Sequence, residues 1–214
     1  MVGVSRFFRQ TLKAVSIYRK TAGAVFMDYI KQTKQRYDEL ARSHEWRHTE
    51  LTPSLVVRFT AMLTGERILD LGSGAGRDTL TLKRYGVHVQ GMDISEEMLA
   101  VAQQNVGDVE FQKGDFRNLP YPDQSFDGIW ANMSLLHLSR HDLPVALSQI
   151  KRVLNDTGVL YASFLTGGDD GFIDGLYYAF YSPNELHEIF DKSGFAIFDE
   201  LVSGDSVHLF LRKK

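Results

Sequence analysis

Three glycines in one short segment allow a protein backbone to come unusually close to a small ligand. They occupy positions 72, 74 and 76 of the segment Asp70-Leu71-Gly72-Ser73-Gly74-Ala75-Gly76. Without a Cβ, glycine lets this loop turn tightly and approach a ligand. A dinucleotide fingerprint requires a third glycine at position 77, where the chain has Arg77, and the segment has no lysine for a P-loop. The loop is therefore suited to close approach, and a pyrophosphate is not the favoured ligand.

Acidic residues follow the glycine loop at the ends of further apolar segments. Asp93 ends the segment Gly91-Met92-Asp93, and a carboxylate there can accept hydrogen bonds from both hydroxyls of a ribose. Asp115 and Phe116 end the next segment, where a carboxylate beside an aromatic ring suits an adenine. A fourth segment, Phe126 to Asn132, ends beneath the same crevice. Each acid alone also suits a helix cap or a solvated loop, and glycines also occur where a helix packs closely on a strand.

Alternating strands and helices must position these residues. Apolar runs and turn residues predict strands at 67–71, 87–92, 109–112, 126–130, 159–164, 195–202 and 206–211. Caps and periodicity predict helices at 28–46, 52–63, 76–85, after Ser95, at 144–154 and at 183–192, with a turn at 155–158. This order predicts an α/β fold: a doubly wound, mostly parallel seven-stranded sheet with helices on both faces and a C-terminal antiparallel hairpin.

The ordered set of motifs resembles the class I S-adenosylmethionine-dependent methyltransferases, from about Tyr37 to the C-terminus. The resemblance implies a Rossmann-like fold, S-adenosylmethionine as cofactor and methyl transfer as the reaction. Residues 151–158 resemble the family's later helix and turn, although the usual Lys-Pro-Gly-Gly is absent. The helix of Tyr37 resembles one that closes over the cofactor. The implied cofactor-binding residues are Tyr37, Asp70, Gly72, Ser73, Gly74, Arg77, Asp93, Ile94, Met98, Asp115, Phe116, Ala131 and Asn132.

Methyl transfer from a sulfonium needs no triad and no metal, because the methyl group is already electrophilic. The protein must place the acceptor in line with the methyl group and exclude water. A base is useful only if the acceptor loses a proton, and His137, just past the fourth strand, is the candidate. The alternative is that His137 packs or caps a helix. Tyr177, Tyr178 and Tyr181 are candidates to line the acceptor pocket, or simply to pack.

The segment His44-Glu45-Trp46-Arg47-His48 matches the His-Glu-x-x-His pattern of zinc proteases. The extended pattern requires glycine and histidine where the chain has Leu51 and Ser54. We therefore expect no metal site, and we interpret this segment as an exposed helix end.

Composition limits the remaining function classes. The 214 residues carry a net charge of −3, which excludes a uniformly basic nucleic-acid binder, and the absence of cysteine excludes disulfides and thiolate metal sites. The longest apolar runs, such as 51–63, are interrupted by Pro53 and Arg58, so no membrane span is expected. We expect a cytoplasmic protein, although organellar targeting by the N-terminal segment stays open.

The N-terminal segment differs in charge from the rest of the chain. Residues 1–36 carry a net charge of +7, whereas the remainder carries −10. Apolar residues recur there at steps of three and four, which is typical of an amphipathic basic helix. We therefore divide the chain into a basic segment, 1–27, and a methyltransferase domain, 28–214. The segment suits a packing or substrate-covering helix, a helix on an anionic membrane surface, or a transit peptide.

Methyl transfer to a small-molecule acceptor is the leading hypothesis. A second hypothesis is an RNA methyltransferase whose basic N-terminal segment follows the phosphates. A third is a regulatory protein that binds the cofactor without turnover, because a fold does not determine a reaction.

Overall fold

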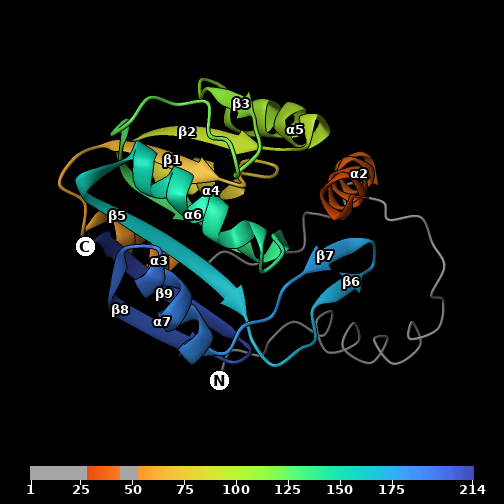
Figure 1. The fold of residues 1–214 in the computed structure, drawn as a ribbon. Coiled ribbons are helices and arrows are strands. Elements are labelled where there is room, and N and C mark those ends of the chain that lie inside the picture. Colours follow the sequence, from red (N-terminus) through yellow and green to blue (C-terminus); the bar gives the residue numbers. More distant parts are fainter. Residues whose placement is uncertain (1–27, 44–52) are drawn as a thin grey trace.

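A seven-stranded sheet forms the centre of the computed structural model, which describes residues 28–43 and 53–214 (Figure 1). The strand order is β3-β2-β1-β4-β5-β9-β8. Strands β1 to β5 are parallel, and β9 is antiparallel to both of its neighbours. The strands are β1 (Arg67–Leu71), β2 (His88–Asp93), β3 (Phe111–Lys113), β4 (Phe126–Ala131), β5 (Leu154–Leu165), β8 (Phe195–Ser203) and β9 (Ser206–Lys213).

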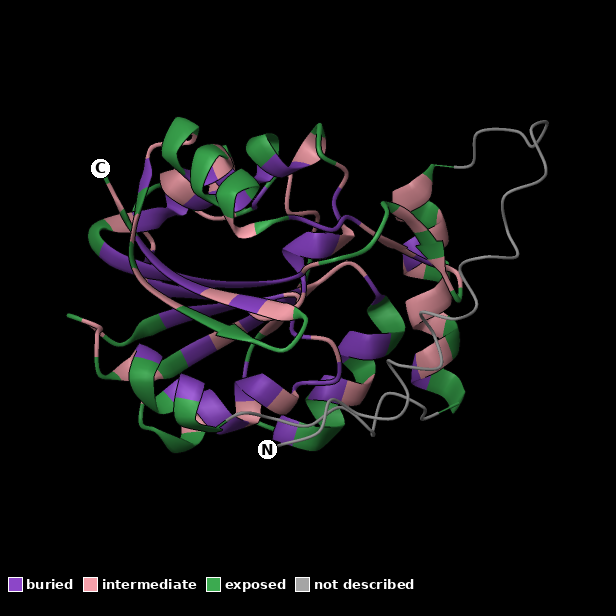
Figure 2. Ribbon diagram, turned by 90° about the horizontal axis from the view of Figure 1, so that it is seen from below, coloured by how far each residue is buried: buried purple, intermediate pink, exposed green. Residues whose placement is uncertain are grey.

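Helices cover both faces of the sheet, because neighbouring side chains of a strand point to opposite sides. In β1, Ile68 joins a core cluster with α3, α4 and α5, whereas Leu69 and Leu71 join the cluster that contains α6 and α7. The central strands β1, β4 and β5 are mostly buried between these layers, and the outer helix faces are exposed (Figure 2). The helices are α3 (Pro53–Thr60), α4 (Arg77–Arg84), α5 (Glu96–Val106), α6 (Asp142–Val153) and α7 (Pro183–Lys192).

Local hydrogen bonds explain why two of these helices begin where the sequence predicts. The Ser95 hydroxyl accepts a hydrogen bond from the backbone N–H of Met98, which caps α5. Ser182 and Glu185 form a reciprocal capping box at the start of α7, and Pro183 occupies the first helical position. The predicted fold class is confirmed, including the C-terminal antiparallel hairpin of β8 and β9.

Two features differ from the sequence prediction. The predicted turn at 155–158 is instead part of β5, which starts at Leu154 and accommodates the extra residues by a register shift against β4. Four residues of β5, 155–158, thus lie opposite Asp127 alone, and regular pairing with β4 resumes at Val159. The second feature is a separate small hairpin, β6 (Gly171–Ile173) and β7 (Leu176–Tyr178), which is not among the predicted strands.

The helix α2 (Tyr29–Ser43) lies beyond the carboxyl ends of the parallel strands, next to the β6–β7 hairpin (Figure 1). Thr33 and Arg36 fix this arrangement. The Thr33 hydroxyl accepts a hydrogen bond from the backbone N–H of Tyr177, and the Arg36 guanidinium donates one to the carbonyl of Asp174. The helix therefore covers the end of the sheet at which doubly wound folds bind their ligands.

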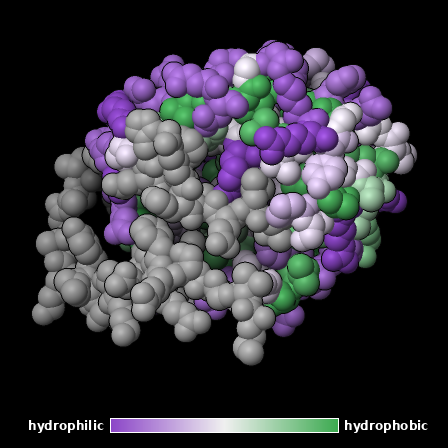
Figure 3. Space-filling view, turned by 180° about the vertical axis from the view of Figure 1, so that it is seen from behind, coloured by the Kyte–Doolittle hydropathy of each residue, from purple (hydrophilic) through white to green (hydrophobic). Residues whose placement is uncertain are grey.

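Hydrophilic residues form most of the described surface in the view of Figure 3, and hydrophobic residues are scattered among them in small groups. None of the described helices combines the length and the hydropathy needed to cross a bilayer. The segment 1–27 and the His44–His48 motif lie outside the described residues.

We expect Gly76 to tolerate alanine less well than Gly86 does. Both have a left-handed backbone, with φ values of +81°, so alanine costs each about 1–2 kcal/mol in conformation. A Cβ at Gly76 would lie 2.8 Å from Val106 and 3.0 Å from Ala102 on α5, whereas a Cβ at Gly86 meets nothing within 4 Å. Overpacking then adds about 1–3 kcal/mol at Gly76 alone. Denaturant unfolding of both variants measures the difference, and equal losses of stability would contradict this close packing of α4 on α5.

Candidate functional site

The glycine loop turns sharply at the carboxyl end of β1. Gly72 has a φ of +84°, and the backbone N–H groups of Gly72 and Ser73 both donate to the carbonyl of Met92, at 2.7 and 3.0 Å. A Cβ on Gly72 would lie 2.4 Å from the Cβ of Ser134. The loop therefore requires glycine at this position, both for its backbone conformation and for its close approach to the segment after β4.

Asp93, at the end of β2, holds the glycine loop in place. One carboxylate oxygen accepts a hydrogen bond from the backbone N–H of Gly74, and the other accepts one from Ser95, both at 2.9 Å. Burial raises the pKa of Asp93, and these backbone N–H groups partly offset that rise. Each oxygen keeps a further lone pair, so the carboxylate can still accept hydrogen bonds from a ligand.

A cavity of about 50 Å³ lies between α2 and the carboxyl end of the sheet. It brings together residues that are far apart in the sequence, including four that the sequence analysis selected: Ile94, Asp115, Phe116 and His137. Ile30 and Thr33 of α2 line it from the other side, with Gly114 and Leu138 completing the wall. Ligand sites usually have several hundred Å³, so this cavity accounts for only part of a site for a larger molecule.

Asp115 has a partner that sequence reasoning missed. The guanidinium of Arg117 donates to both of its carboxylate oxygens, with an Nη2–Oδ2 distance of 2.7 Å. Burial alone would raise the pKa of Asp115, but Arg117 lowers it overall. Arg117 also contacts Asp142 at 3.1 Å, and Asp142 accepts a hydrogen bond from Tyr29 at the start of α2. The acid selected for the adenine is therefore connected to the covering helix.

His137 lies in the short 3₁₀ helix η3 (Leu135–His137), where its two ring nitrogens have different partners. Nδ1 lies 2.6 Å from the carbonyl oxygen of Tyr177, and Nε2 lies 2.7 Å from the hydroxyl of Tyr37. Burial lowers the pKa of His137 to about 4, so the ring is neutral at pH 7. A base with so low a pKa gains little driving force for taking a proton at neutral pH.

Asn132 and Asp78 form a buried polar network beneath β4. Asp78 accepts hydrogen bonds from the Asn132 amide at 2.7 Å and from the Trp130 indole at 2.9 Å. The Asn132 oxygen in turn accepts a hydrogen bond from the hydroxyl of Ser163. The side chain of Asn132 is thus engaged in the interior, and its backbone is what remains for a ligand. Ala131, just before it, is fully buried.

The neighbouring acid, Asp70, is also buried. Its carboxylate accepts a hydrogen bond from Thr79 at 2.5 Å, while Arg77 contacts Asp78 at 3.1 Å. Burial and the nearby charge of Asp78 raise the pKa of Asp70. In this structure Asp70 therefore contacts the first turn of α4, and Arg77, the first residue of that helix, contacts its neighbour Asp78.

The candidate tyrosines occupy different environments. The Tyr178 ring packs against His137, with ring centres 4.7 Å apart, and so borders the crevice. Tyr181 is 1% exposed, and its ring lies between Phe164 and the guanidinium of Arg140, which places it in the core. Met98 packs in a small cluster with Tyr37, Ala41 and Ala75, which joins α2, the glycine loop and α5.

Two buried serine hydroxyls near the glycine loop have no hydrogen-bond partner within residues 28–43 and 53–214. They belong to Ser73, in the loop, and to Ser134, which faces Gly72. An unpaired buried hydroxyl is unfavourable by about 1–3 kcal/mol, so such groups usually meet water or a ligand. Sequence reasoning selected Ser73 but missed Ser134, whose only signal is its position three residues after β4.

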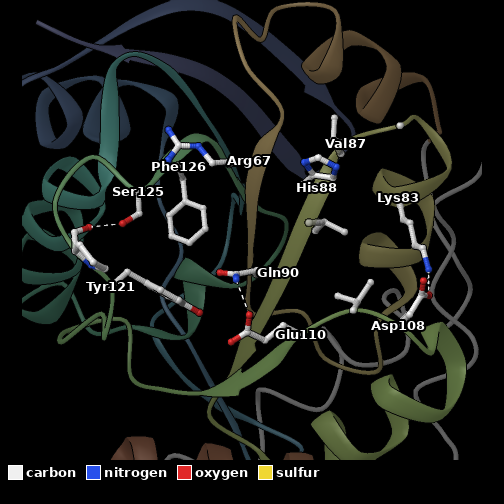
Figure 4. A pocket seen from close by; sticks show the side chains of 14 residues that line it. Arg67, Lys83, Val87, His88, Gln90, Asp108, Glu110, Tyr121, Ser125 and Phe126 are labelled. Atoms are coloured by element: carbon white, nitrogen blue, oxygen red, sulfur yellow. Dashed lines mark hydrogen bonds and ion pairs between the residues drawn. The ribbon is translucent and has the colours of Figure 1, made fainter.

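A larger cavity, of about 780 Å³, lies at the opposite end of the sheet (Figure 4). Its walls come from the amino-terminal ends of β1 and β2 and from the segments before β3 and β4. Arg67, His88, Glu110, Tyr121 and Phe126 line it. None of the candidate site residues lies in this wall, and ligands of doubly wound folds bind at the carboxyl ends of the strands. The crevice beneath α2 is therefore the candidate active site.

Comparison with known proteins identifies the family of this chain. The family described as "Methyltransferase domain" matches residues 68–158, which run from β1 into β5. A demethylmenaquinone methyltransferase of Thermotoga maritima is 32% identical over 157 residues, covering 72% of this chain and 68% of that relative. The chain belongs to the S-adenosylmethionine-dependent methyltransferases. A second relative, the O-methyltransferase cnsE of Penicillium expansum, is 33% identical over 150 residues. The matched region covers 63% of this chain and 54% of that protein.

The fold of this methyltransferase also matches solved structures. The 1,6-didemethyltoxoflavin-N1-methyltransferase of Burkholderia thailandensis, whose structure holds S-adenosylhomocysteine, superposes with a TM-score of 0.71 at 21% identity. The match covers 90% of this chain and 93% of that one. The cofactor of the family, S-adenosylmethionine, suits the residues present here. The buried hydroxyls of Ser73 and Ser134 lack partners among the described residues and lie in or against the glycine loop, and Asp93 binds this loop with one carboxylate oxygen.

We expect acid to destabilise the wild-type methyltransferase more than the His137→Gln variant. In the unfolded chain His137 gains a proton below pH 6.5, whereas in the folded protein it stays neutral until about pH 4. The unfolded state therefore binds more protons between these values, and stability falls as the pH falls through them, by about 2–3 kcal/mol in total. Denaturant unfolding at pH 7 and pH 4.5 measures the loss for both proteins. The same loss in both would show that His137 is not held neutral.

Proposed function

We propose that this methyltransferase transfers the methyl group of S-adenosylmethionine to a small-molecule acceptor that enters the crevice beneath α2. The observation that carries the proposal is that the glycine loop, Asp93, Asp115 and Phe116 lie at the same edge of the sheet. There Asp93 binds the loop, and Asp115 and Phe116 line the cavity beneath α2. The named activities of the two sequence relatives, on demethylmenaquinone and as an O-methyltransferase, support a small acceptor.

Each part of the crevice has a proposed role toward the cofactor. We assign the ribose hydroxyls to Asp93, whose carboxylate stands beside the glycine loop. Ile94 and Phe116 provide apolar contact for the adenine, and Asp115 accepts a hydrogen bond from its amine. The methionine end lies against the backbone of the glycine loop and of residues 131–132. Tyr37 and Met98 cover the middle of the cofactor.

Bound S-adenosylmethionine supplies a methyl group on positively charged sulfur, which is electrophilic without further activation. The work of this chain is then to bind, orient and exclude water. The α2 helix excludes water, because hydrogen bonds join it to α5, to the β6–β7 hairpin and to Asp142. We assign no general base. The neutral His137, with a pKa of about 4, is a poor proton acceptor at pH 7.

The acceptor side of the crevice is rich in aromatic rings. Tyr178 packs on His137, and Tyr177 of the same hairpin packs on Tyr29 of α2, with ring centres 4.7 Å apart. Phe172 lies against Tyr177 at 5.6 Å and is exposed at the rim. Aromatic walls of this kind favour a flat, partly apolar acceptor.

We expect Asp93→Ala to weaken S-adenosylmethionine binding by at least tenfold. The substitution removes hydrogen bonds from the ribose to a charged group, each worth about 1.5–3 kcal/mol. Isothermal titration calorimetry measures the affinity. Asp169→Ala, which removes a carboxylate from an exposed loop residue, is the control, and we expect it to bind normally. Unchanged affinity in a folded Asp93→Ala protein would contradict the ribose assignment.

We expect methyl label to reach the small-molecule fraction of a cell extract. The purified protein is incubated with S-adenosylmethionine carrying a labelled methyl group, and the extract is separated into RNA, protein and small molecules. Label in RNA that depends on low salt and is lost on deletion of residues 1–27 would favour the RNA hypothesis instead. Cofactor binding with no labelled product in any fraction would favour the regulatory protein.

A further inference from the structure

The two hydrogen bonds of His137 determine where its single ring proton lies. A carbonyl oxygen only accepts hydrogen bonds, so Nδ1, 2.6 Å from the carbonyl of Tyr177, must carry the proton. The neutral ring then has only a lone pair at Nε2. Because Nε2 lies 2.7 Å from the Tyr37 oxygen, the Tyr37 hydroxyl must donate its proton to His137.

This arrangement fixes what Tyr37 can offer to the crevice. A tyrosine hydroxyl has one proton and two lone pairs, and here the proton is committed to His137. Within the described residues the Tyr37 hydroxyl has no second hydrogen-bond partner. It therefore presents an oxygen that accepts but does not donate. Burial raises the pKa of Tyr37, so the hydroxyl stays protonated and uncharged at neutral pH.

Tyr37 also lies at an informative point along the crevice. Its ring packs with Met98 and Ala75 at the glycine loop. Asp93, the proposed ribose acid, is close enough that its negative charge helps to raise the pKa of Tyr37. On its other side, Tyr37 meets His137 edge to face, with ring centres 5.4 Å apart, and His137 packs on Tyr178 of the acceptor wall. The hydroxyl thus stands between the proposed ribose end and the acceptor end, where the sulfonium group belongs.

We propose that His137 is a positioning residue that acts through Tyr37, holding the Tyr37 hydroxyl so that its oxygen lone pairs face the positive sulfonium of S-adenosylmethionine. This inference rests on the proposed function. An oxygen acceptor attracts a sulfonium and its polarised methyl group, but it gains little from the neutral sulfur of S-adenosylhomocysteine. The pair therefore favours the methylated cofactor over the demethylated product at the same site.

Two substitutions of His137 separate this role from a purely structural one. In His137→Gln the side-chain oxygen takes the place of Nε2 and still accepts the Tyr37 proton, while the bond to Tyr177 is lost. In His137→Asn the side-chain nitrogen takes the place of Nδ1 and still donates to Tyr177, while Tyr37 loses its acceptor. Tyr37→Phe removes the oxygen itself and serves as an independent check.

Calorimetry of each protein with S-adenosylmethionine and with S-adenosylhomocysteine gives the ratio of the two dissociation constants. We expect His137→Asn and Tyr37→Phe to shift this ratio about tenfold toward S-adenosylhomocysteine, the scale of one hydrogen bond to a charged group. His137→Gln keeps the wild-type ratio, and His137→Asn in the Tyr37→Phe background adds no further shift.

Two results would overturn the role of His137. The first is an unchanged ratio of dissociation constants in His137→Asn. The second is a shift of this ratio in His137→Gln as large as that in His137→Asn, because it would mean that the bond to Tyr177 matters instead. Thermal unfolding of each variant confirms that folded protein is compared, and Tyr37→Phe gives an answer even if a His137 variant fails to fold. If the wild-type protein binds neither ligand, the proposed function fails, and this inference fails with it.

Discussion

The carboxylate of Asp93 is the interaction on which the crevice depends. It stands at the end of a buried strand and receives one backbone N–H from the glycine loop and one from the start of α5. Ser95, which caps α5, also donates its hydroxyl proton to Asp38 of α2 at 2.6 Å. The loop, the cap and the covering helix are thus connected through two neighbouring residues. A buried carboxylate is unfavourable unless such bonds satisfy it, so the local order of these three segments depends on that charge.

A second buried set of polar groups supports the same edge of the sheet from below. Asp78 joins the first turn of α4 to Trp130 and Asn132 at the end of β4, and Asn132 continues to Ser163 and Tyr161 of β5. These contacts connect the start of α4 to the ends of β4 and β5. They also explain why the glycine loop and the segment with Ser134 come so close that Gly72 has no room for a side chain.

Sequence reasoning succeeded where local chemistry decides the structure. The bounds of β1 and α7 were predicted correctly, because a short apolar run and a capping box depend on neighbouring residues alone. The predicted acids Asp93 and Asp115 lie at the same edge of the sheet because parallel strands end on the same side of a sheet. The partners of His137 were missed for two reasons. Tyr37 lies 100 residues away, and Tyr177 belongs to a hairpin whose Asp174-Gly175 turn signal the sequence analysis overlooked. Tyr181 was selected from a cluster of tyrosines, and only packing shows that it points into the core.

The closed position of α2 affects how the cofactor binds. Bonds from Tyr29, Thr33, Tyr37 and Asp38 hold the helix over a cavity far smaller than any nucleoside cofactor requires. If the cofactor enters only when these bonds open, its apparent affinity is the intrinsic affinity reduced by the fraction of molecules that are open. Each 1.4 kcal/mol of preference for the closed state weakens apparent binding about tenfold. The bonds that hold α2 over this edge of the sheet therefore both limit the access of water and reduce the apparent affinity for the cofactor.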